Sequence, residues 1–226
     1  DMFYAVCKGE TWFRVGETVR YELTGKLPHF AFMKDVFFKI AGEYGEHVSQ
    51  NVEFGGAALG TLPIDARRTM ATMGAELSAE FATFEPDDIL LDYVKQRTKV
   101  PLEPQMPDND ADYLDVREIN LSMIKPLVAL PDSVVNNSAN VGDVAGTRLD
   151  QCFVGSCANG TFDDLSSVAK VLAGRKVSRG TRFIVTPGSQ SIYRRALKAG
   201  IIETLMEAGA VVTNSTCGAC GGGHMG

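Results

Sequence analysis

The spacing of hydrophobic residues predicts strands and helices that alternate through the first half of the chain. Val19, Tyr21 and Leu23 alternate with polar residues, as they do on a strand with one buried face. Apolar residues between 33 and 40 recur with helical spacing, and a second helix is expected from Asp65, its N-cap, to about Ala79. The apolar face of that second helix consists of Thr69, Met70, Met73 and Leu77.

The second half of the chain predicts a parallel sheet. Helices separate three expected strands, at 149–154, 182–186 and 210–213. A capping box of Thr161 and Asp164 marks the start of the first of these helices. Each strand is followed by a loop, and the loops are GSCANG (155–160), PGSQ (187–190) and NSTCGACGGG (214–223). Because right-handed crossovers align the carboxyl ends of parallel strands, we expect Cys157, Cys217 and Cys220 to lie at one edge.

Two polar stretches divide this pattern. The segment 101–112 is rich in Pro, Asp and Asn and is expected to be a loop. A second polar stretch, 131–147, is also expected to be a loop and to mark a domain boundary. We therefore predict two three-layer α/β domains with mostly parallel sheets, one over 1–130 and one over 131–226 that carries the three cysteines.

Composition and charge narrow the classes of function. The 226 residues are 45% hydrophobic and 22% charged, as in ordinary globular proteins. A net charge of −6 argues against a nucleic-acid partner, and no apolar run approaches the roughly 20 residues of a membrane span. Five cysteines without a secretory signal fit a reducing, cytoplasmic compartment. Because the chain starts at Asp1 and stops at Gly226 after a glycine-rich stretch, we expect it to be a piece of a longer polypeptide.

The cysteine pattern indicates a metal or redox centre. A Cys-x-x-Cys pair on a tight loop, with a third cysteine on the same edge, offers three thiolates. Three thiolates on a four-iron cluster would leave one iron open to a substrate oxygen. The Cys-x-x-Cys pair by itself is equally typical of a redox dithiol or half of a zinc site. Cys7 and Cys152 are interpreted as ordinary residues, the latter in the core.

Five segments resemble the family of aconitase and isopropylmalate dehydratase large subunits. The most specific are GSCANG and TCGACGGGHMG (216–226), which resemble the family's two cysteine loops. VTPGSQSIYRRALKAG (185–200) resembles its proline–glycine–serine segment and the helix after it. In the first half, KGETWFRVGETVRYELTGKLP (8–28) resembles the start of the family's second domain, and MGAELSAEFATFEPDD (73–88) resembles its glutamate helix and next strand.

This resemblance implies a site. Cys157, Cys217 and Cys220 would hold a 4Fe–4S cluster, and Glu76 would lie beside the iron that lacks a protein ligand. Contacts with the cluster or substrate are also implied for Asn159, Ser189 and Gln190, although turns use such residues for structural reasons too. Thr72 replaces the Asn that family members often carry one turn before the glutamate, which leaves the identity of the substrate open.

The same resemblance implies the activity and the partners. We expect a hydro-lyase that dehydrates and rehydrates a 2-hydroxy di- or tricarboxylic acid, with 3-isopropylmalate of leucine biosynthesis as the first candidate. Homoaconitase, a methylmalate-type dehydratase, aconitase and a non-catalytic metal or redox module are the alternatives. A small subunit or swivelling domain would supply the catalytic serine. Because nothing here matches the family's first domain, this chain alone is expected to be inactive.

Overall fold

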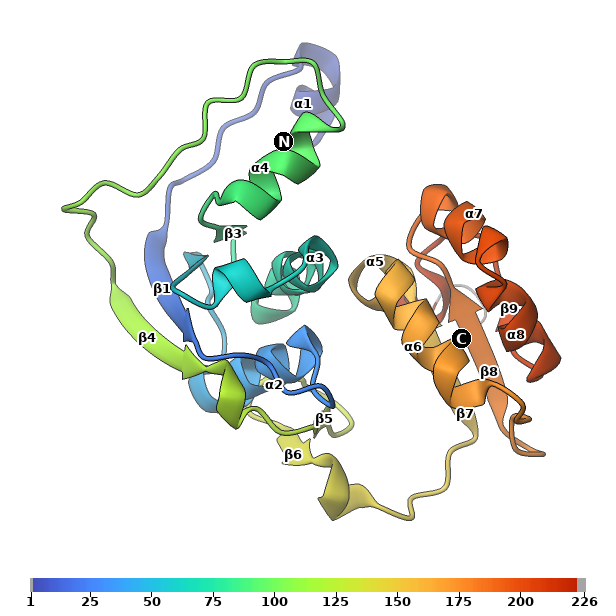
Figure 1. Cartoon of the computed structure of the whole chain (residues 1–226). Helices are drawn as coiled ribbons and strands as arrows, with labels where there is room; N and C mark the ends of the chain where they lie inside the picture. The colour runs from blue at the N-terminus through green and yellow to red at the C-terminus, as the bar shows by residue number, and fades with distance from the viewer. Residues whose placement is uncertain (1, 223–226) are drawn as a thin grey trace.

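The computed structural model describes residues 2–222 of the chain. It has an α/β architecture with two parallel sheets and a small antiparallel hairpin between them (Figure 1). The four-stranded sheet is formed by the first half of the chain and the three-stranded sheet by the second half. Among the described residues no helix is long and apolar enough to span a bilayer. The predicted fold class, α/β with mostly parallel sheets, is confirmed.

The four-stranded sheet has the order β3-β2-β1-β4, with all strands parallel. Its strands are β1 (Glu17–Thr24), β2 (Gln50–Gly55), β3 (Phe81–Phe84) and β4 (Asp115–Asn120). The predicted alternation on β1 is confirmed, since Val19, Tyr21 and Leu23 are fully buried. The apolar face of the sheet shares one core with α2 (Met33–Tyr44) and α3 (Ile64–Met73).

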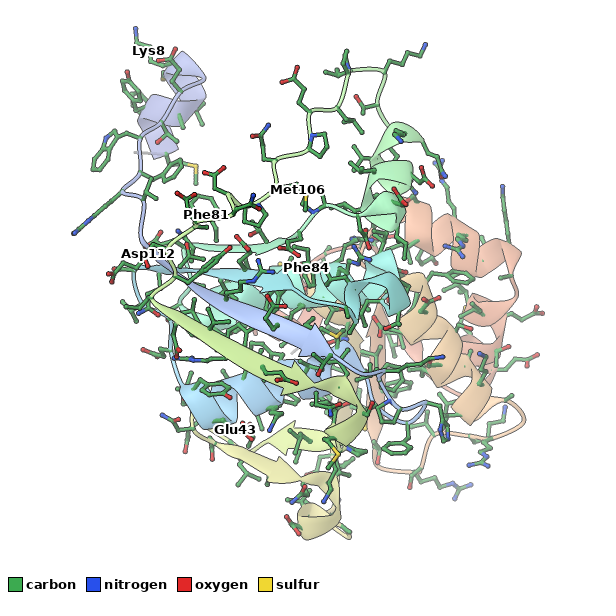
Figure 2. All side chains as sticks on the ribbon, turned by 60° about the vertical axis from the view of Figure 1, so that its left-hand side comes forward. Lys8, Glu43, Phe81, Phe84, Met106 and Asp112 are labelled. Atoms are coloured by element: carbon green, nitrogen blue, oxygen red, sulfur yellow. The ribbon has the colours of Figure 1, made fainter. Side chains whose placement is uncertain are left out.

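Aromatic stacking between neighbouring strands and an ion-pair network on the polar face also stabilise this sheet. Phe84, labelled in Figure 2, lies on the edge strand β3. Its ring stacks on Phe54 of β2 with ring centroids 4.8 Å apart. The opposite, polar face carries Arg20, whose guanidinium pairs with three carboxylates. Those carboxylates belong to Glu22, Glu53 and Glu85. One face of the sheet is therefore an apolar core and the other is held by charges.

The helix predicted from Asp65 to Ala79 is shorter in the structure. Pro63 stands at the N-cap position, and Asp65 lies within the first turn. The α-helix ends at Met73, and a 3-10 helix, η2 (Gly74–Leu77), follows it. Gly74 lies against β3 so closely that an added Cβ would be 2.5 Å from that of Ala82. Contact with the sheet therefore decides where the α-helix ends.

The helix α4 (Asp88–Lys95) is anchored to α3 by a buried arginine. Asp87 is its N-cap and accepts a hydrogen bond from the backbone N–H of Leu90. Arg67 on α3 donates to both carboxylate oxygens of Asp87, at 2.7 and 2.6 Å. These hydrogen bonds hold the pKa of Asp87 below its usual range.

The segment 101–112 contains no helix or strand, as predicted.

The stretch 131–147 was predicted to be a loop, and this is wrong in part. Strands β5 (Leu127–Ala129) and β6 (Ser138–Asn140) form an antiparallel hairpin, and a 3-10 helix, η4 (Val141–Val144), follows. The hairpin is held by α2, since Ser138 donates to the carbonyl of Phe38 at 2.8 Å and Asp35 accepts from the N–H of Leu127 at 2.8 Å. The sequence pattern missed it because these contacts are long-range. The boundary predicted at 130 falls inside this hairpin.

The three-stranded sheet has the order β7-β8-β9, again parallel. Its strands are β7 (Gln151–Gly155), β8 (Arg182–Thr186) and β9 (Val211–Val212). One core unites the sheet with α6 (Phe162–Leu172), α7 (Gln190–Lys198) and α8 (Ile201–Glu207). The predicted capping box of Thr161 and Asp164 begins α6.

The remaining elements are short. They are α1 (Met2–Lys8), η1 (Leu59–Thr61), η3 (Leu121–Met123), α5 (Ser156–Asn159) and η5 (Gly218–Gly221). Neither α1 nor α4 buries a residue fully. Within the described residues, the first sheet therefore shares its core with α2 and α3, and the second shares its core with α6, α7 and α8.

Candidate metal centre

The two cysteine loops follow the carboxyl ends of two parallel strands. Cys157 lies on α5, directly after β7, and the 217–220 pair lies on η5, after β9. The central strand β8 separates them and is followed by the loop 187–189. In open parallel sheets, ligands bind outside this edge of the strands. The expected shared edge is therefore present.

The first cysteine loop is a short helix in a strained conformation. Ser156 has φ +67, in the left-handed region that few residues other than glycine adopt. Cys157 comes next and its side chain is exposed. Gly160 closes the turn, because its N–H donates to the carbonyl of Ser156 at 3.0 Å. Strain of this kind persists only where the surroundings hold it, and it is concentrated at functional sites.

The second cysteine loop presents both of its thiols from one turn. Cys217 is the N-cap of η5, and the N–H of Cys220 donates to the carbonyl of Cys217 at 3.2 Å. Both cysteines are exposed. Between them Gly218 has φ +58, and an added Cβ would lie 2.6 Å from Oγ1 of Thr186. Only glycine satisfies both conditions, so Gly218 lets the loop press against β8.

Both cysteine loops pack against Thr186, a residue that the sequence pattern did not predict as part of the site. It is fully buried at the end of β8, and its hydroxyl lies 2.7 Å from that of Thr213. An added Cβ on Gly160 would lie 2.7 Å from the carbonyl oxygen of Thr186. One on Gly218 would meet the Thr186 hydroxyl. The available signal was its position, the last residue of the central strand before PGSQ.

The three thiols are not grouped as ligands of a single metal ion within the described residues. No three Cys, His, Asp or Glu side chains within residues 2–222 are grouped so that they could hold one metal ion. A cluster does not require such convergence, because each of its thiolates binds a different iron atom. Two polar atoms beside the loops, Oδ1 of Asn159 and Oγ of Ser215, are buried without a hydrogen-bond partner in this part of the chain. Buried polar atoms are normally paired, so both fit a partner that the described residues do not supply.

The carboxyl groups near the site differ in their surroundings. Asp164 lies beside the first cysteine loop, and burial raises its pKa against the opposing hydrogen bonds from Thr161. Glu76 is exposed on η2 and takes part in no hydrogen bond or ion pair within the described residues. Thr72 is half-buried on α3. The η2 segment with Glu76 continues directly from α3, which packs against α5 (Figure 1).

The loop between β8 and α7 has a structural role in this arrangement. Ser189 is the N-cap of α7, and its hydroxyl accepts from the N–H of Ile192 at 3.2 Å. Gln190 is the exposed first residue of that helix. The N–H of Gly188 donates to the carbonyl of Gly160 at 2.9 Å, which ties this loop to the first cysteine loop. The last four residues of the second cysteine motif, 223–226, lie outside the described residues.

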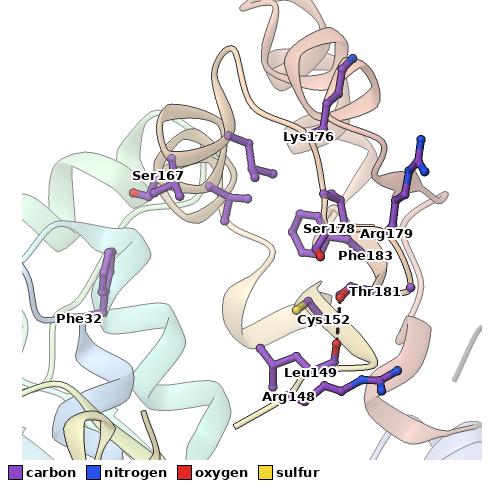
Figure 3. Close-up of a pocket in the computed structure, with 15 residues that line it drawn as sticks. Phe32, Arg148, Leu149, Cys152, Ser167, Lys176, Ser178, Arg179, Thr181 and Phe183 are labelled. Carbon is purple, nitrogen blue, oxygen red and sulfur yellow. Dashed lines mark hydrogen bonds between the residues drawn. The ribbon is translucent and has the colours of Figure 1, made fainter. Parts of the chain in front are cut away.

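A large hollow lies at the other end of the sheet. It measures about 900 Å³ and is lined by apolar side chains such as Leu149, Val171 and Phe183 (Figure 3). Leu149 and Thr181 mark its position at the amino ends of β7 and β8, where the Thr181 hydroxyl donates to the carbonyl of Leu149 at 2.9 Å. Cys152 lines this hollow and is half-buried, and it packs against the core of the second half, where it was predicted to lie. The hollow is therefore separate from the cysteine loops.

Known proteins resemble the chain along its whole length. The model of the aconitase family (aconitate hydratase) matches residues 2–141 and 132–226. The 3-isopropylmalate dehydratase large subunit of Mycolicibacterium smegmatis is 47% identical over 226 residues, which cover 100% of this chain and 54% of that protein. A probable methanogen homoaconitase large subunit of Methanothermobacter thermautotrophicus is 40% identical, over 100% of this chain and 53% of that protein.

A solved structure is also similar. The holo-form of aconitase X from Thermococcus kodakaraensis aligns with a TM-score of 0.47 and 14% identity, over 89% of this chain and 44% of that one. The chain spans about half the length of the curated relatives that it matches. With the family model matched from residue 2 to residue 226 and close relatives aligned over its full length, the chain belongs to the aconitase family.

Proposed function

We propose that the complete protein is a 4Fe–4S hydro-lyase that isomerises 3-isopropylmalate by dehydration and rehydration. The observation that carries this proposal is the placement of three exposed cysteines on two loops after the strands of one parallel sheet. The 47% identity to a 3-isopropylmalate dehydratase large subunit supports the choice of substrate. By itself this chain contains about half of such a protein, so we expect it to be inactive.

Cys157, Cys217 and Cys220 would hold the cluster. When bound, it would supply a Lewis acid for a substrate hydroxyl, because three thiolates leave one iron without a protein ligand. The described part of the chain offers no fourth cysteine at this edge, since Cys152 lines the hollow at the other end of the sheet and Cys7 lies on α1. The unpaired polar atoms of Asn159 and Ser215 would contact the bound group or the substrate.

Glu76 would manage a proton in this reaction. Its carboxylate is exposed and has no hydrogen-bond partner within residues 2–222, so it is available to a ligand. A hydroxyl that leaves as water needs a proton, and a carboxyl group positioned beside it can donate that proton and take it back on rehydration. The neighbouring Thr72 would line the substrate on the same side as Glu76, and Ser189 and Gln190, at the start of α7, would also contact the substrate or the cluster.

The complete enzyme would need two further parts. The relatives at 47% and 40% identity are named as large subunits, which supports a small-subunit partner for this protein. That partner would supply the serine base that removes the proton on the adjacent carbon. The large-subunit segments beyond this chain would supply further groups that bind the substrate carboxylates.

Replacing one cysteine tests the cluster ligands. We expect Cys157→Ser to remove bound iron and sulfide as completely as Cys217→Ser, because three ligands leave no redundancy. Cys7→Ser is the matched control, since Cys7 is exposed on α1. Iron and sulfide are measured per chain in the complete protein, purified without oxygen. Full iron and sulfide in Cys157→Ser would show that Cys157 is not a ligand.

The substrate is tested by comparing hydroxy acids. We expect the complete two-subunit protein to turn over 3-isopropylmalate with a higher kcat/KM than the substrates of homoaconitase, aconitase or methylmalate-type enzymes. A preference for the homoaconitase substrate would favour the alternative suggested by the 40% identical relative. A colourless protein that contains zinc and no iron would instead favour a non-catalytic metal module.

A further inference from the structure

A buried threonine on α3, in the first half of the chain, hydrogen-bonds to the first cysteine loop, which follows a strand of the second sheet. Thr69 is 4% exposed, and its hydroxyl oxygen lies 2.7 Å from the carbonyl oxygen of Ala158. The carbonyl of Asp65, in the same helix, is further away at 3.2 Å and lies at the i−4 position, where the helical N–H of Thr69 already donates. The hydroxyl has one proton, so the geometry gives that proton to Ala158.

The cysteine loop has little stability of its own. The helix α5 has four residues, too few to be stable in isolation, and it begins at the strained Ser156. Its C-terminal side is fixed to the sheet by Gly160, whose carbonyl accepts from the N–H of Gly188 at 2.9 Å. On its other side, Ala158 packs against the core of the first half of the chain. The hydrogen bond from Thr69 to Ala158 crosses that interface.

The acceptor adjoins a residue of the proposed site, and the donor lies on the helix that leads to another. Ala158 directly follows Cys157, and α3 leads into η2, which carries Glu76. A single hydrogen bond therefore joins the cysteine loop of the second half to the glutamate segment of the first. We propose that Thr69 is a positioning residue, which fixes Cys157 relative to Glu76. This inference rests on the proposed function only for the role of Glu76, since the hydrogen bond itself does not depend on it.

The first test measures the loop without any cluster. In the complete protein freed of metal, we compare hydrogen–deuterium exchange of the segment 156–162 among the parent, Thr69→Val and Thr69→Ser. Valine keeps the shape and removes the donor, so the exchange rate should rise about fivefold or more, as expected for the loss of a net contribution of about 1 kcal/mol. Serine keeps the hydroxyl and should exchange like the parent. Exchange in 190–198 of α7 should be the same in all three proteins.

Two results would overturn the inference. Unchanged exchange in Thr69→Val would show that the hydroxyl does not hold the loop. Equal acceleration in Thr69→Ser, which keeps the hydroxyl, would show that the loop responds to any change at this position and that the hydrogen bond is not what holds it. If Thr69→Val does not fold, Thr69→Ala supplies the same comparison, because alanine favours helix and also lacks the donor.

The second test concerns catalysis and separates this inference from the proposed function. In the cluster-loaded enzyme, Thr69→Val should lower kcat about fivefold or more while KM changes less, because the loss affects alignment and not substrate contacts. A parent protein with no dehydratase activity would contradict the proposed function, and the exchange data would still decide the role of Thr69. An active Thr69→Val enzyme with normal kcat and accelerated exchange would show that the hydrogen bond holds the loop without aligning the site.

Discussion

Thr186 and Gly218 show how closely single residues are fitted at the cysteine edge of the sheet. Thr186 is fully buried at the end of the central strand, and Gly218 lies against it with no space for a side chain. Cys217 and Cys220 flank this glycine on both sides. The position of the paired thiols therefore depends on a contact that involves neither of them.

Alanine substitution measures the importance of that contact. We expect Gly218→Ala to lower stability by about 1–3 kcal/mol and to reduce the iron bound per chain, because the new Cβ meets Thr186 and the φ of +58 is strained for alanine. Gly221→Ala is the matched control, since its Cβ would meet nothing within 4 Å and its φ is not positive. Thermal unfolding and iron analysis of the complete protein provide the measurements. Equal effects of the two substitutions would contradict this explanation.

Glu76 is the other residue whose role can be isolated. We expect Glu76→Gln to keep the fold and the bound iron and to lower kcat by about 10²-fold or more, because a general acid–base group typically contributes about 10²–10⁴ in rate. The side chain is exposed, so the nearly isosteric change should cause no packing defect. Glu80→Gln, also exposed and four residues further on, is the control. A fully active Glu76→Gln enzyme, or an equally damaged Glu80→Gln enzyme, would refute the assignment.

At the scale of elements, a buried histidine links three strands of the first sheet. His47 is 1% exposed, and its Nδ1 lies 3.0 Å from the Gln50 side-chain oxygen, to which it must donate. Its Nε2 therefore accepts from the hydroxyl of Tyr21, 2.9 Å away on β1, and that hydroxyl accepts from Arg117 on β4 at 3.0 Å. Burial of the Tyr21 side chain raises the pKa of its hydroxyl to about 12.

This network makes stability depend on pH. Burial lowers the pKa of His47 below its usual value of 6.5, so the neutral ring is favoured in the folded state. The unfolded chain then binds more protons than the folded one as pH falls below about 6.5, so stability is complete above that pH and is lost below it. We expect urea unfolding between about pH 7.5 and 5 to show this loss in the parent and a smaller one in His47→Gln.

His29→Gln is the matched control for that measurement. His29 is exposed, and its replacement should leave the dependence of stability on pH as it is in the parent. If His47→Gln and the parent lost stability in parallel over the whole range, the buried ring would not be the group responsible.

At the scale of the whole chain, the described residues form two cores that meet at the interface of α3 and α5. The first core unites the four-stranded sheet with α2 and α3, and the second unites the three-stranded sheet with α6, α7 and α8. Ala158 belongs to the second half of the chain by sequence but packs against the first core. The division into domains 1–130 and 131–226 stays a prediction, and the β5–β6 hairpin spans its boundary.

Local patterns determined much of this structure. The alternation on β1, the apolar face of α3, the aspartate cap of α4 and the capping box of α6 all depend on residues within a few positions of one another. Their strand or helix type was therefore predictable from the sequence. The cysteine motifs likewise predicted the family, because each motif is a short, continuous loop that follows a strand.

Only the tertiary structure decided the features that depend on distant contacts. The α-helix of 64–73 gives way to a 3-10 helix because Gly74 meets β3, and the β5–β6 hairpin forms because α2 holds it. Nothing in the sequence distinguishes Thr69 and Thr186 from other threonines of an apolar face or strand. In the structure, Thr69 hydrogen-bonds to the first cysteine loop, and both cysteine loops pack against Thr186. A sequence pattern reports which face of an element is apolar, whereas the partner that this face meets is decided by how the whole chain packs.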